Sequence, residues 1–136
     1  MKVKLSDIIN AIASIDRYSE YFLDKETGDL VYINDMAMTA DEKEAAYNAL
    51  DEHGFYRLPT SFDIREYGIM EEFVVSLPSF ARDRLSDAIV GKGAFRRFKN
   101  TVRRLGIEEQ WYEWRDNAYR RLAIDWCENC GLEFEI

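Results

Sequence analysis

The sequence predicts an α+β fold: a mostly helical domain with a small antiparallel sheet packed by helices, and a long C-terminal helix. Two aromatic and β-branched runs flank a polar turn around Gly28, which indicates a hairpin. Apolar residues recur at helical spacing over most of the remaining chain. With 136 residues, 47% of them hydrophobic, the chain has the size and core material of one domain, so we expect a single domain over residues 1–136.

The N-terminal half supplies the predicted sheet. A short first helix is indicated by four isoleucines at helical spacing: Ile8, Ile9, Ile12 and Ile15. Ser6 would cap its N-terminus. Residues 21–23 and 30–33 then form the hairpin, and Gly28 supplies the positive φ of its turn. The run 55–59 is short, aromatic and ended by a proline, which is typical of an edge strand.

Capping residues and helix breakers bound the next three predicted helices. Thr39 and Glu42 form a capping-box pattern that opens a helix, and Gly54 would end it. Residues 69–77 and 85–89 mark two further helices, ended by a proline and a glycine.

The last predicted helix, from about Glu108 to Asn129, has a broad apolar face with three tryptophans. At helical spacing such a stripe is usually core, although part of it would also suit a dimer face. On the polar side we expect Asp116 and Arg120 to form an i,i+4 pair.

One basic segment interrupts an acidic protein. The formal net charge is −8, yet residues 91–104 carry six basic side chains and no acidic one: Lys92, Arg96, Arg97, Lys99, Arg103 and Arg104. Phe95, Phe98, Val102 and Leu105 would face the core, so the segment predicts an amphipathic helix over residues 94–105. Its cations would bind an anion, or they would only balance the acidic body, as charge runs commonly do.

Other candidate sites are weaker. Cys127 and Cys130 have CxxC spacing, but they fall at a helix C-terminus, where the dipole disfavours a thiolate. His53, the only histidine, would lie as a cation in the last turn of its helix. Acidic residues around Gly28 lack the spacing of a calcium loop and indicate a solvated turn. We therefore predict no catalytic residue, metal site or cofactor.

Several segments of the chain together form a recognisable pattern: GKGAFRRFKN, WYEWRDNAYRRLAIDWCEN and the following Gly-Leu, and also KLSDIINAI, LDKETGDLVYI, YRLP and EYGIMEEF. Through these segments the chain resembles a bacterial family known only as uncharacterised protein family 0158. The resemblance covers nearly the whole chain. It implies no activity, substrate or cofactor, since the family has none established. Cys130 departs from the family pattern, which argues against a CxxC-based function.

The first functional hypothesis is a non-enzymatic interaction domain that binds an anionic ligand or an acidic protein through the basic helix and Lys92. The net charge of −8 and the pI of about 4.7 disfavour a dedicated nucleic-acid binder. Two alternatives stay open: a homo-oligomer that uses the aromatic helix, and an enzyme with an Arg/carboxylate pocket near Lys92. No stretch of about 20 apolar residues occurs, and the N-terminus does not resemble a leader, so we expect a cytoplasmic protein without membrane partners.

Overall fold

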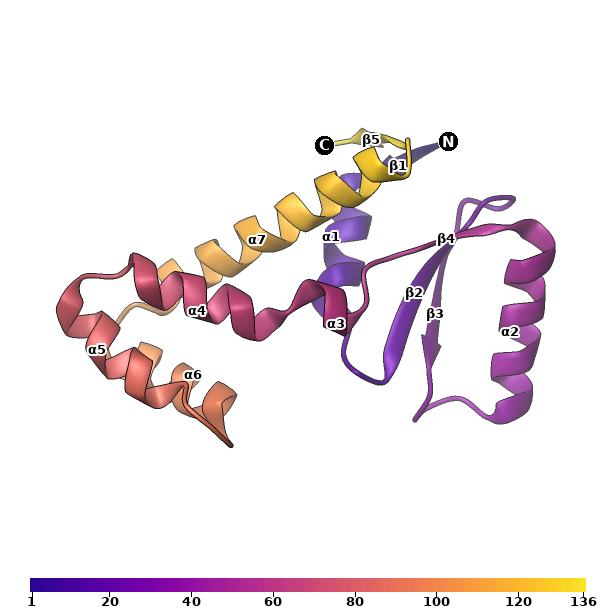
Figure 1. Cartoon of the computed structure of the whole chain (residues 1–136). Coiled ribbons are helices and arrows are strands. Elements are labelled where there is room, and N and C mark those ends of the chain that lie inside the picture. Colours follow the sequence, from indigo (N-terminus) through magenta and orange to yellow (C-terminus); the bar gives the residue numbers. More distant parts are fainter. The chain divides into compact units, whose positions relative to one another are not determined.

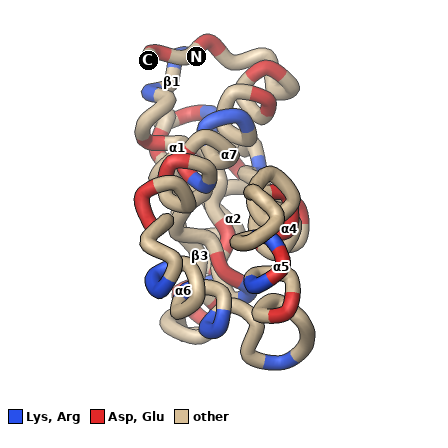
Figure 2. The backbone as a smooth tube through the Cα atoms, turned by 90° about the vertical axis from the view of Figure 1, so that its left-hand side faces the viewer, with Lys and Arg blue, Asp and Glu red and all other residues tan.

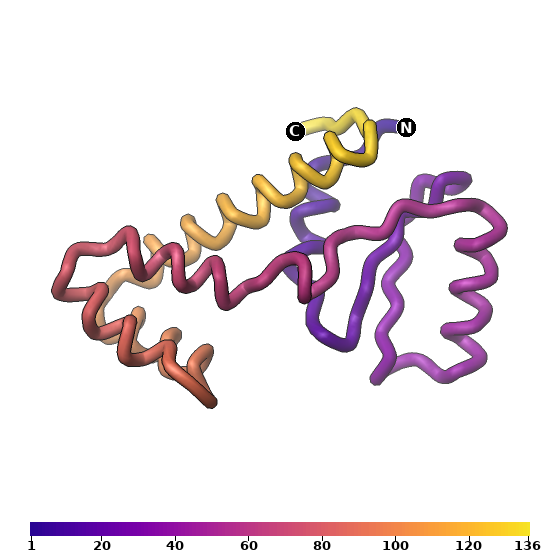
Figure 3. Tube along the Cα trace, in the orientation of Figure 1, coloured from indigo at the N-terminus to yellow at the C-terminus, as the bar shows by residue number.

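A computed structural model describes residues 1–136 (Figures 1 and 3). It confirms the α+β class: helices predominate, and the strands form a small antiparallel sheet and a separate parallel pair. The chain divides into two compact units, residues 1–64 with 119–136, and residues 65–118. The expectation of a single domain stays a prediction.

In the first unit, strands β2 (Ser19–Asp24), β3 (Leu30–Asn34) and β4 (Phe55–Arg57) form an antiparallel sheet with the order β3-β2-β4. The hairpin and the edge strand are thus confirmed, and Gly28 has a φ of 76°. Successive residues of a strand face opposite sides, so the burial of both Phe22 and Leu23 shows that β2 is covered on both faces.

Helix α2 (Ala40–His53) covers one face of this sheet. Thr39 and Glu42 form the predicted capping box, with Glu42 N–H donating to the Thr39 hydroxyl and Thr39 N–H donating to the Glu42 carboxylate. At the other end, the Gly54 N–H donates to the Leu50 carbonyl. Leu50 packs with Phe22 and Ile33 in one buried cluster, which fixes the helix on the sheet.

The prediction for the first helix was wrong in its cap. Helix α1 (Leu5–Ser14) begins directly after strand β1 (Lys2–Lys4), so Lys4 occupies the N-cap position and Ser6 lies inside the helix. Strand β1 pairs in parallel with β5 (Glu133–Glu135), which follows Gly131, a residue with a φ of 69°. Neither of these strands, nor the one-turn helix α3 (Ser61–Ile64), was predicted.

The second unit contains α4 (Glu66–Ser76), α5 (Ser79–Ala88), α6 (Ala94–Arg104) and the first half of α7 (Glu108–Asn129). Its core is aromatic. The Trp111 ring lies 4.8 Å from Phe98 and 5.3 Å from Phe73, measured between ring centroids. The Trp114 indole also packs on Phe73 and donates to the Ile69 carbonyl at 3.2 Å. These contacts tie α4, α6 and α7 together.

Helix α7 has the predicted limits, and most of its apolar stripe is core. Trp111, Tyr119 and Trp126 are buried within the single chain. The expected pair of Asp116 with Arg120 was wrong, because Asp116 is contacted by the adjacent Arg115 at 3.4 Å. No helix combines the length and the apolar character that a membrane crossing requires.

Candidate functional site: the basic face of α6

Helix α6 is positioned by one apolar stripe. Ala94, Phe98 and Val102 recur every four residues and are all buried, whereas the basic residues on the rest of the helix surface face solvent. The helix begins after Gly93, whose φ is 81°, and ends before Gly106, whose φ is 69°. The predicted amphipathic helix over residues 94–105 is therefore confirmed.

The cations of this segment are exposed, and most of them lack a carboxylate partner. Arg103 lies 3.4 Å from Glu108, and both side chains face solvent. No ion pair involves the remaining residues with free cationic groups: Lys92, Arg96, Lys99 and Arg104. Figure 2 shows basic residues along α6 with no acidic residue among them. Pairing with a carboxylate of the same chain thus explains only one of these cations, Arg103.

Arg97 differs from the other five cations. Its Nε donates to the Ala88 carbonyl at 2.9 Å, and its two terminal nitrogens donate to the carbonyls of Lys92 and Val90. These acceptors lie at and just beyond the C-terminus of α5, where the dipole favours a cation. Arg97 therefore caps α5 and joins it to α6. The sequence placed Arg97 among the anion-binding residues, but its donors are bound to backbone carbonyls of the same chain.

Gly93 gives Arg97 room to reach these carbonyls. A Cβ at Gly93 would lie 3.0 Å from the Arg97 Nη1, and the φ of 81° already disfavours any side chain. Gly91 has a similar φ of 76°, but a Cβ there would meet nothing within 4 Å. The glycine before the helix is thus needed for both backbone geometry and space.

Phe95 lies beside the basic residues on the surface. The sequence predicted that it anchors the helix in the core, but its side chain is 47% exposed. Its ring packs edge-on against Tyr67 of α4, with centroids 6.3 Å apart. The Tyr67 hydroxyl donates to the Ile89 carbonyl, so its ring is held in place. An exposed, ordered aromatic pair therefore borders the basic face.

The net charge of −8 is not shared evenly by the two units. Residues 65–118 contain ten basic and nine acidic side chains, a net charge of +1. The other unit contains eight basic and 17 acidic side chains, a net charge of −9. The unit that carries α6 is thus close to neutral, and its unpaired cations are concentrated on one helix.

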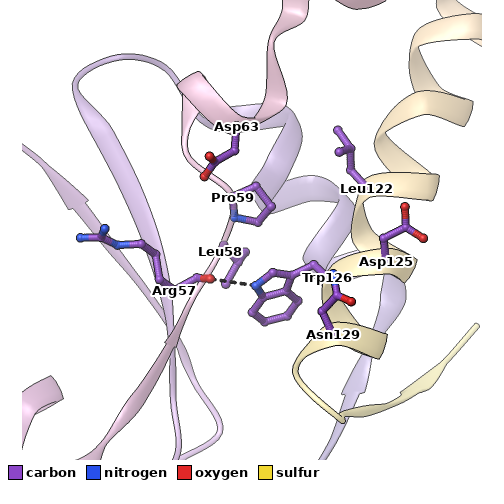
Figure 4. Close-up of a pocket in the computed structure, with 8 residues that line it drawn as sticks. All are labelled: Arg57, Leu58, Pro59, Asp63, Leu122, Asp125, Trp126 and Asn129. Atoms are coloured by element: carbon purple, nitrogen blue, oxygen red, sulfur yellow. Dashed lines mark hydrogen bonds between the residues drawn. The ribbon is translucent and has the colours of Figure 1, made fainter.

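A separate cavity of about 270 Å³ lies in the first unit (Figure 4) and is lined by Arg57, Leu58, Pro59, Asp63, Leu122, Asp125, Trp126 and Asn129. The Trp126 indole N–H donates to the Arg57 carbonyl at 2.8 Å, which closes one side of it. None of the six basic residues lines this cavity, so it does not supply the pocket near Lys92 that the enzyme hypothesis required.

His53 has a partner that the sequence did not indicate. It lies in the last turn of α2 as predicted, and its Nδ1 is 2.7 Å from the Asp24 Oδ2 at the hairpin turn. Asp24 is only 5% exposed, and its Oδ1 also accepts the N–H groups of Glu26 and Thr27. The prediction of a solvated turn was therefore wrong for Asp24. The contact could not be predicted from the sequence because Asp24 and His53 are 29 positions apart.

These contacts shift both pKa values. The hydrogen bond from His53, with that from the Thr27 amide, lowers the pKa of Asp24. The same Asp24 contact raises the pKa of His53 against the opposing effect of desolvation. The pair is thus stabilised in its charged form, and it links the hairpin to α2.

The two thiols are free, and Cys127 is buried. Burial raises the pKa of Cys127, and the neighbouring Cys130 and Glu128 raise it further. Burial also raises the pKa of Cys130, against an opposing effect of the Lys25 charge. A CxxC redox site needs a thiolate, so the environment of this pair favours the structural interpretation.

Comparison with protein-family models gives one match. A model described as an uncharacterised protein family (UPF0158) covers residues 1–136. Neither the curated proteins nor the solved structures contain a match to the chain.

Proposed function

The chain belongs to the uncharacterised protein family UPF0158, and for this member we propose an interaction domain that binds an anionic polymer through the basic face of α6. The observation that carries the proposal is the set of exposed cations without carboxylate partners: Lys92, Arg96, Lys99 and Arg104. Like charges on one surface repel one another, and an anionic ligand bound there would relieve that repulsion.

The helix presents these groups on a rigid support. Phe98 and Val102 are fully buried, and Arg97 ties the first turn of α6 to the end of α5. Arg forks and Lys ammonium groups donate charge-assisted hydrogen bonds to phosphate or carboxylate oxygens, so this face suits a ligand with several anionic groups in a row.

The test compares binding of a fluorescent heparin oligosaccharide to the wild type and to a double reversal, Arg96→Glu with Lys99→Glu, by anisotropy. We expect the reversal to remove most of the binding, while circular dichroism stays unchanged because both side chains are exposed. The matched control is Arg120→Glu with Arg121→Glu. It makes the same change in net charge at two exposed positions of α7.

Equal loss in both doubles would mean that net charge, not the α6 face, determines binding, and the proposal would fail. Failure of the wild type to bind heparin at low salt would also reject it.

We also propose a cytoplasmic location. Both cysteines are free thiols, and Cys127 is buried in the core of its unit, as suits a reducing compartment.

A further inference from the structure

We infer that the anionic polymer is a single-stranded nucleic acid, an inference that rests on the proposed function of α6. It depends on the aromatic pair at the border of the basic face. Cations alone would accept any polyanion, whereas exposed aromatic rings beside them add a surface on which an unpaired base stacks.

The geometry of the aromatic pair supports stacking. Phe95 forms a T-shaped pair with Tyr67, with an angle of 71° between the ring planes. Its side chain is 47% exposed, so part of the ring surface is free for a base. Tyr67 is partly exposed as well, and its hydroxyl bond to Ile89 fixes it. A ring that is already ordered loses little conformational entropy when a base binds.

The cations beside Phe95 follow the helix in a row. Lys99 is one turn after Phe95, and Arg96 and Arg103 flank Lys99 at spacings of three and four residues. From Arg96 to Arg103 the helix rises by about 10 Å. One strand of nucleic acid along this row would place phosphates on the cations and a base over Phe95.

An acidic protein fits this surface less well, because carboxylates do not make use of an exposed aromatic pair. A duplex also fits less well, since its bases are stacked on one another and leave no face for Phe95. The overall charge of −8 weakens long-range attraction, but the unit that carries α6 has a net charge of +1, so contact at short range is not opposed there.

The experiment measures anisotropy of a labelled oligouridine of roughly 12 nucleotides with the wild type and with Phe95→Ala. Loss of the stacked base should weaken binding by about fivefold or more. With about three phosphate contacts, affinity should fall roughly 20-fold between about 50 and 200 mM salt. The control, Phe80→Ala, removes an aromatic that is 66% exposed on α5 in the same unit and should leave affinity unchanged.

The same two variants are measured with the labelled heparin oligosaccharide and with a labelled poly-glutamate peptide. We expect Phe95→Ala to leave heparin binding intact, since heparin offers no base. A labelled duplex of the same length is measured in the same way. If Phe95→Ala binds oligouridine as well as the wild type does, or if the wild type binds poly-glutamate or the duplex as tightly as oligouridine, the nucleic-acid inference is overturned while the basic face remains a polyanion site. If the wild type binds neither heparin nor oligouridine, both the proposed function and the nucleic-acid inference are rejected.

Discussion

His53 Nδ1 and Asp24 Oδ2 lie 2.7 Å apart and join the end of α2 to the turn between β2 and β3. The contact spans 29 residues of sequence. Glu26 lies near the other ring nitrogen, 3.5 Å from Nε2, so two carboxylates face the imidazole. The stability of this unit should therefore depend on pH.

The pH dependence should have a defined window. The pKa of Asp24 is lowered from 3.8, so its contribution is present above pH 3.8 and is lost as the pH falls through the folded-state pKa. The pKa of His53 is raised from 6.5, so its contribution is complete below pH 6.5 and is lost as the pH rises through the folded-state pKa. Urea unfolding of the wild type and of His53→Gln should differ most between pH 3.8 and 6.5. A difference that stayed equally large at pH values well below and well above this window would contradict the ion pair.

Arg97 and Arg96 are adjacent, exposed and chemically identical, but only Arg97 is bound to backbone carbonyls. Arg97→Ala should lower the free energy of unfolding by about 1–2 kcal/mol, because charge-assisted hydrogen bonds at the α5 C-terminus are lost. Arg96→Ala should change it by less than about 0.5 kcal/mol. Thermal unfolding followed by circular dichroism measures both, and equal effects would show that Arg97 is not a cap.

Gly93→Ala should destabilise the protein more than Gly91→Ala. Both positions have φ near 80°, so each variant loses about 1 kcal/mol from backbone strain, but only the Cβ at Gly93 meets Arg97. In the Arg97→Ala background the extra cost at Gly93 should disappear. A double-mutant cycle by urea unfolding tests this coupling, and additive effects would argue against the steric explanation.

Helix α7 provides one indole hydrogen bond to each unit. Trp126 donates to the Arg57 carbonyl in the first unit, and Trp114 donates to the Ile69 carbonyl in the second. Replacing either by Phe should cost about 1–2 kcal/mol, with the larger effect at Trp126, whose bond is shorter and whose side chain is the more buried of the two. Hydrogen exchange with mass spectrometry should show faster exchange around residue 57 in Trp126→Phe and around residue 69 in Trp114→Phe. The same exchange pattern in both variants would contradict this assignment.

The thiols should react slowly. Burial raises the pKa of both Cys127 and Cys130, so little thiolate exists at neutral pH. With an aromatic disulfide reagent at pH 7.5, a value near physiological pH, we expect Cys130 to react more slowly than glutathione, and Cys127 only after denaturation. Rapid reaction of both thiols in the native protein would indicate an activated pair instead.

Local patterns in the sequence predicted most elements because they depend on neighbours in the chain. The capping box at Thr39, the positive φ at Gly28 and the stripe of Phe98 and Val102 each involve residues a few positions apart. The pairing of β1 with β5 was missed because each strand has only three residues, and their partners lie at opposite ends of the sequence. Such short strands carry no periodic signal.

The candidate site divides in the same way. The spacing of Arg96, Lys99 and Arg103 on one exposed arc could be read from helical periodicity. That Arg97 turns back to α5 could not, because its acceptors are backbone carbonyls that have no sequence signal. Phe95 was placed in the core since it follows the apolar pattern, but the stripe is centred on Phe98, which leaves Phe95 at its edge.

The parallel pairing of β1 with β5 also affects how the chain can be rearranged. Lys2 lies opposite Glu133 and Lys4 opposite Glu135, so the first and last strands of the chain lie side by side, and each carries one terminus (Figure 1). A short linker should be able to join them, with new ends opened in an exposed turn elsewhere in the chain, to give a circular permutant. A reporter fused at one end would lie beside a reporter fused at the other.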